Sequence, residues 1–110
     1  MSEFDKFTNP IQGSTQTLTM PATAKTLEDA GVVKKDKMQL MLITFEGAIG
    51  DVVGRTFDDG TAPDASNGIE ILGKAQAVVT EESFDDTQII AIGTPVNFTV
   101  QQYESENLHL

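Results

Sequence analysis

Apolar and polar residues alternate along several short stretches of the chain, and this pattern predicts β-strands. In residues 96–103, Val96, Phe98 and Val100 fall on one side of an extended chain and Asn97, Thr99 and Gln101 on the other. Side chains of a strand point alternately to its two faces, so this stretch predicts a half-buried strand. Alternation, or a short apolar run between turn residues, predicts further strands at 17–20, 38–46, 51–57, 69–72, 76–80 and 87–92.

The stretch 38–46 is the most apolar part of the chain, and it is apolar on both faces. A strand exposed to water on one side would alternate more cleanly. The strand is therefore either central in a sandwich or covered on its outer face by another subunit. On the second interpretation, Met41, Ile43 and Phe45 are candidate residues of a subunit interface.

The number and spacing of these stretches predict the fold class. About seven or eight short strands, about 8–12 residues apart and separated by turn residues, are typical of all-β folds. We expect a single-domain antiparallel β-sandwich or jelly-roll-like barrel. Residues 22–30 fit a short helix as well as a strand.

We predict three segments: an extended N-terminal arm (1–16), a β-sandwich domain (17–104) and a C-terminal tail (105–110). The arm has no helical or alternating period, but it carries Phe4, Phe7 and Ile11. On a free tail these apolar side chains would be exposed to water, so we expect them to pack on a neighbouring subunit. The alternative is a frayed terminus.

The chain of 110 residues has a net charge of −10, from 17 acidic and 7 basic residues. This charge argues against nucleic acid and anionic membranes as partners, because both need a basic surface. Residues 1–37 are neutral overall, and residues 38–110 carry the whole net charge. This uneven distribution has two interpretations: the acidic residues only keep the protein soluble, or the chain has a neutral end that docks and an acidic body that faces outwards. Residues 1–20 hold no apolar run, so we expect no signal peptide.

The inventory of reactive side chains is small. The chain has no cysteine and one histidine, His109, so thiolate metal sites, multi-histidine metal sites and histidine-based triads are excluded. The acidic pairs Asp58–Asp59 and Asp85–Asp86 admit a glycosidase interpretation, and residues 58–64 admit a loose calcium site. Solvated loop acids explain the two pairs better, and ordinary turn chemistry explains residues 58–64 better. We therefore expect no enzyme activity, no cofactor and no metal.

Two residues of the predicted strand 51–57 stand out. Gly54 indicates a β-bulge or a close approach of another backbone. Arg55 is the single arginine of the chain, and its guanidinium suits a bidentate bond to a carboxylate. We expect a local ion pair with Asp58 or Asp59. The alternative is an ion pair across a subunit contact, which makes Arg55 a candidate interface residue.

Residues 51–68 (DVVGRTFDDGTAPDASNG), the apolar Ile89–Ile92 and the closing strand that ends at Tyr103 form a recognisable series. The series resembles small all-β surface proteins in the virions of tailed bacteriophages. The resemblance implies a small protein on the outside of a virus particle, as capsid decoration (cement) or as part of a tail or fibre assembly. We expect a capsid decoration protein on the virion surface, assembled in the host cytoplasm. The predicted partners are the major capsid protein or other virion proteins, and other copies of the chain, with a trimer favoured. A tail, neck, baseplate or fibre component and a carbohydrate-binding β-sandwich module remain as alternatives.

Overall fold

The computed structural model describes residues 9–104, which fold into eight strands joined by turns and loops, without a helix. No helix in this range could therefore span a membrane. The strands are β1 (Gln16–Thr19), β2 (Lys25–Thr26), β3 (Leu40–Phe45), β4 (Val52–Phe57), β5 (Ile69–Leu72), β6 (Gln76–Thr80), β7 (Gln88–Ala91) and β8 (Asn97–Tyr103).

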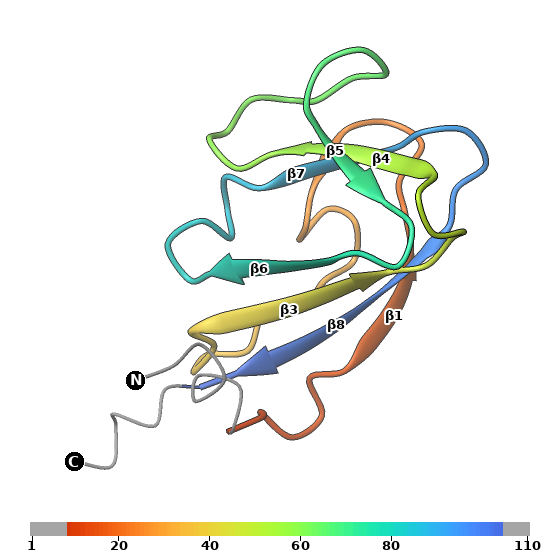
Figure 1. The fold of residues 1–110 in the computed structure, drawn as a ribbon. Coiled ribbons are helices and arrows are strands. Elements are labelled where there is room, and N and C mark those ends of the chain that lie inside the picture. The colour runs from red at the N-terminus through yellow and green to blue at the C-terminus, as the bar shows by residue number, and fades with distance from the viewer. Residues whose placement is uncertain (1–8, 105–110) are drawn as a thin grey trace.

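The strands form two four-stranded sheets that face each other (Figure 1). Sheet A has the order β1-β8-β3-β6 and sheet B the order β2-β7-β4-β5. The pairing is nested: β1 pairs with β8, β2 with β7, β3 with β6 and β4 with β5, all antiparallel. Nested pairs placed alternately in two sheets make an eight-stranded jelly roll. The predicted all-β sandwich is confirmed.

The core lies between the two sheets, and the alternating side chains of β3 and β8 supply its centre. Met41, Ile43 and Phe45 of β3 are at most 3% exposed, and so are Phe98 and Val100 of β8. The rings of Phe45 and Phe98 lie with their centroids 6.2 Å apart. A single apolar cluster therefore holds the two sheets together.

This arrangement corrects the prediction that Met41, Ile43 and Phe45 form a subunit interface. They point into the core of their own chain, so a folded neighbour cannot reach them. The pattern did not show which face of this strand is the core, because Leu40 and Leu42 on its outer face are also apolar. β3 lies between β8 and β6, which half-bury these outward leucines.

The predicted N-terminal arm is also corrected where the structure describes it. Residues 9–16 lie along β8: the Ile11 N–H donates to the Gln102 oxygen at 2.9 Å, and Pro10 forms an isolated bridge with Tyr103. Ile11 packs against the core of its own chain. Phe4, Phe7 and the predicted tail at 105–110 lie outside the described residues.

Candidate functional site: an uncharged sheet face

Sheet A carries no acidic or basic residue in any of its four strands. In these strands the inward positions fill the core, and the outward positions hold threonine, amide and aliphatic side chains, together with one tyrosine. We call these outward residues the neutral face; they are Thr17, Thr19, Leu40, Leu42, Thr44, Gln76, Val78, Thr80, Asn97, Thr99, Gln101 and Tyr103.

Hydrogen bonds between neighbouring strands order the polar side chains at the β1 side of the neutral face. The Thr19 hydroxyl donates to Asn97 Oδ1 at 3.0 Å, and the hydroxyls of Thr17 and Thr99 lie 3.3 Å apart. These are register partners across β1 and β8. Cross-strand pairs of this kind stabilise a sheet, and they also fix the side chains that a partner would meet.

The β6 side of the neutral face is more apolar. Leu42 of β3 lies directly opposite Val78 of β6, and Val78 is 50% exposed. In the next row, Gln76 Nε2 donates to the Thr44 hydroxyl at 3.4 Å. The face therefore changes from hydrogen-bonding groups at β1 to mixed aliphatic and polar groups at β3 and β6.

Charged residues gather on sheet B and on the loops. Sheet B contains Lys25, Arg55 and Glu70 within its strands, and the loops at 58–64 and 81–86 hold seven acidic residues. The neutral first third and the acidic part of the chain do not form two separate ends of the fold. β1, from the neutral third, pairs with β8, from the acidic part, so both parts contribute to sheet A. Among the acidic residues at 9–104, only Glu70 lies in a strand, and the others lie in loops and turns.

Arg55 forms the local ion pair that we expected, but with another partner. Its Nη2 lies 3.5 Å from Glu70 Oε2 on the neighbouring strand β5. The guanidinium also donates to two backbone oxygens of the β4–β5 loop, from Nε to Ala65 and from Nη1 to Gly68. Because the guanidinium bonds to its own chain, Arg55 serves as an anchor for this loop.

The acidic side chains of the β4–β5 loop carry out turn chemistry. Asp59 accepts the Thr61 N–H at 3.0 Å, and Asp64 accepts the N–H groups of Ser66 and Asn67, each at 2.8 Å. Hydrogen bonds from Thr61 hold the pKa of the Asp59 carboxyl below its ordinary value of 3.8. The general acid of a glycosidase needs a raised pKa, whereas the pKa of Asp59 is lowered.

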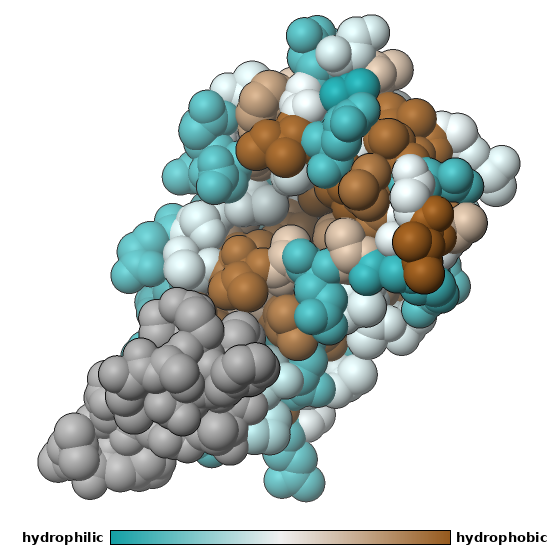
Figure 2. Space-filling view, viewed as in Figure 1, coloured by the Kyte–Doolittle hydropathy of each residue, from teal (hydrophilic) through white to brown (hydrophobic). Residues whose placement is uncertain are grey.

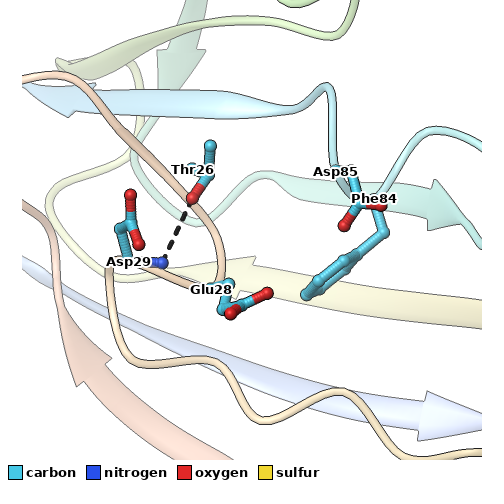
Figure 3. Close-up of a pocket in the computed structure, with 5 residues that line it drawn as sticks. All are labelled: Thr26, Glu28, Asp29, Phe84 and Asp85. Carbon is cyan, nitrogen blue, oxygen red and sulfur yellow. Dashed lines mark hydrogen bonds between the residues drawn. The ribbon is translucent and has the colours of Figure 1, made fainter.

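A pocket of about 190 Å³ lies between the turn after β2 and the β6–β7 loop (Figure 3). Phe84 forms its apolar wall, and Glu28, Asp29 and Asp85 line it together with Thr26. Sites for drug-sized ligands are larger, about 300–1,000 Å³. Across residues 9–104, no three acidic or histidine side chains converge as a metal ion would require.

Gln102 is a structurally important polar residue that the sequence pattern did not predict. It lies at an inward position of β8 and is completely buried. Its Nε2 donates to the Val33 oxygen at 2.7 Å, and its Oε1 accepts the Lys35 N–H at 2.8 Å. Gln102 follows Phe98 and Val100 at two-residue spacing, so the alternation of this strand already places a glutamine on the inward face.

The chain matches no protein-family model, no curated protein and no solved structure.

Proposed function

We propose that this protein is a non-enzymatic structural protein of a virus particle, which decorates the outer capsid lattice and stabilises it. In this proposal the neutral face of sheet A lies on the capsid, and the acidic loops point towards solvent. The resemblance of residues 51–68 and of the closing strand to virion surface proteins supports the assignment. The jelly roll supports it too, because viral capsid proteins often use this scaffold.

The observation that carries the proposal is an uncharged sheet face on a chain with a net charge of −10. Burying a carboxylate without a partner is costly, and the centres of protein interfaces are depleted in charged residues. Of the two sheet faces, the outer face of sheet A is the one that can be covered without desolvating an ion.

The ordered side chains of the neutral face also suit repeated, rigid contacts. The hydrogen-bonded pair of Thr17 and Thr99 keeps its hydroxyls in place before a partner arrives. Less side-chain freedom is then lost on binding. On a lattice, many copies bind side by side, so a weak individual contact is enough when assembly makes the binding multivalent.

The direct test is to add the purified protein to capsids that lack it. We expect binding at fixed lattice positions, visible by electron microscopy, and a higher temperature of capsid disruption. Labelled protein found only at the tail or baseplate would contradict the capsid assignment. Absence of binding to any part of the particle would contradict the structural role altogether.

A further inference from the structure

We infer that β6 is a self-association edge, through which two copies of this chain pair their sheets A antiparallel about a two-fold axis at Val78. β6 is the last strand of sheet A, and no other strand of the described chain pairs with its second edge. The pairing concerns the free protein, so it does not depend on the proposed capsid role.

The backbone of β6 has hydrogen-bonding groups available at this edge. The Phe45 N–H donates to the Ala75 oxygen, and the Glu81 N–H donates to the Gln39 oxygen, so odd-numbered residues face β3. In an antiparallel ladder the residues between them direct their N–H and C=O groups the other way. Gln76 and Val78 therefore point these groups towards the open edge. At Thr80 the N–H donates to the Ser83 hydroxyl, which closes the available edge at that end.

The side chains of β6 suit pairing with themselves. Antiparallel pairing about Val78 places Val78 opposite its copy, Gln76 opposite Thr80 and Ala77 opposite Val79. Because the Thr80 N–H is already bonded to Ser83, only Val78 and its copy exchange a full pair of backbone hydrogen bonds, and Gln76 meets Thr80 through its side chain. Apolar side chains then meet apolar ones and polar side chains meet polar ones, with no charge between them. β5, an edge of sheet B, carries the charged Glu70, so it lacks the uncharged character of β6.

The charges that flank β6 favour the same antiparallel direction. Lys74 comes just before the strand, and Glu81 and Glu82 come just after it. Lys74 forms an ion pair with Glu46 at 2.9 Å, so this end of β6 is close to neutral, whereas Glu81 and Glu82 make the other end acidic. Antiparallel pairing brings the neutral end of one copy to the acidic end of the other. Parallel pairing would place the two acidic ends side by side, and like charges at a rim disfavour that direction.

The surface beside this edge is apolar as well. In the view of Figure 2, hydrophobic surface borders the open side of the sandwich at β5 and β6. Val78 in β6 is 50% exposed, and Ile69 and Leu72 in β5 are 62% and 41% exposed. An exposed, uncharged edge strand is otherwise a risk for aggregation, and pairing with a second copy removes that risk. A contact of this type closes at two copies, in place of the trimer expected from the sequence.

Sedimentation equilibrium of the full chain tests the inference. We expect a mass near twice 11.9 kDa at high concentration for the wild type. Val78→Lys places two like charges opposite each other and should raise the dissociation constant at least about tenfold. Val33→Lys is the matched control, because Val33 is another exposed valine, at 59%, outside β6. It should dimerise like the wild type, and circular dichroism should show that both variants are folded.

A cross-link tests the position of the two-fold axis. The natural chain has no cysteine, so Val78→Cys gives a single thiol. Residues opposite each other in a hydrogen-bonded antiparallel pair have Cα atoms about 5.5 Å apart, which suits a disulfide. Oxidised glutathione should convert Val78→Cys to a covalent dimer much faster than Val33→Cys. A monomeric wild type, a trimer, equal dissociation of the two lysine variants, or equal cross-linking of the two cysteine variants would overturn the inference.

Discussion

The buried carboxamide of Gln102 donates a hydrogen bond to the backbone oxygen of Val33, 2.7 Å away. The two residues are far apart in sequence, and the bond fastens the long segment between β2 and β3 to the inner side of β8. We predict that Gln102→Leu destabilises the fold by about 1–3 kcal/mol, because it leaves the part-buried Val33 oxygen and Lys35 N–H without their partner. Urea unfolding measures the change. Gln39→Leu, at an exposed position, should change the free energy of unfolding by no more than about 0.5 kcal/mol.

Ile43 and Thr44 are neighbours in β3 that face opposite sides of sheet A. Ile43 is 2% exposed in the core, whereas Thr44 belongs to the neutral face. We predict that Ile43→Asp unfolds the monomer, because a buried unpaired carboxylate costs several kcal/mol or must take up a proton. Thr44→Asp should stay folded. Circular dichroism and resistance to protease distinguish the two variants. A folded Ile43→Asp protein would show that the core is assigned wrongly.

Gly54 lies in β4 opposite Ala91 of β7. A Cβ atom at this position would lie 2.7 Å from the Ile90 backbone oxygen and 2.6 Å from the Met20 Cε atom. We predict that Gly54→Ala lowers the free energy of unfolding by about 3 kcal/mol, at the upper end of the cost of overpacking.

The matched control for Gly54→Ala is Gly93→Ala. Gly93 has a φ of +71° and open space around it, so this substitution should cost only about 1–2 kcal/mol, for the left-handed backbone. Thermal unfolding of the two variants gives the comparison. An equal loss in both would mean that contact with Ile90 does not matter.

The Asp64 carboxyl makes the stability contribution of the β4–β5 loop depend on pH. Hydrogen bonds from the Asn67 side chain and the Ser66 N–H hold the pKa of its carboxyl below the ordinary value of 3.8. A carboxyl with a lowered pKa in the folded state contributes stability above its unfolded pKa. This contribution is lost as the pH falls through the folded pKa. The stability difference between the wild type and Asp64→Asn should therefore be constant near neutral pH and shrink below about pH 4.

Measurements of unfolding free energy from neutral to acidic pH check this prediction, together with the titration of the Asp64 carboxyl by NMR. An Asp64 carboxyl that titrates above 3.8 would contradict the assigned hydrogen bonds.

Local patterns predicted most of the strands, because alternation in a strand such as β8 depends on neighbouring residues alone. Gly54 was also predicted correctly as a bulge or close approach: the register shifts between Val52 and Gly54, and the added Cβ would meet Ile90. The two-residue strand β2 was not resolved from a short helix, because Lys25 and Thr26 are strand residues only through pairing with β7.

The candidate site was harder to predict than the strands. Which face of β3 is the core depends on where sheet B packs, and this is a contact between residues distant in sequence. The same holds for charge: the neutral face combines residues from four strands, and only the jelly-roll topology brings β1 and β6 into one sheet. Arg55 pairs with Glu70, and not with the nearby Asp58 or Asp59, because the β4–β5 register places Arg55 directly opposite Glu70.

The central claim is that the neutral face docks on the capsid. Its most direct test measures how a variant with one charge on this face binds to capsids that lack the protein. Thr17→Glu puts a carboxylate on an exposed position of this face, and Thr23→Glu puts one on an exposed position of the β1–β2 loop as a control. We predict that Thr17→Glu weakens capsid binding at least about tenfold, since the carboxylate must be desolvated, and that Thr23→Glu binds like the wild type. Unchanged binding of a folded Thr17→Glu protein would contradict the claim that sheet A docks on the capsid.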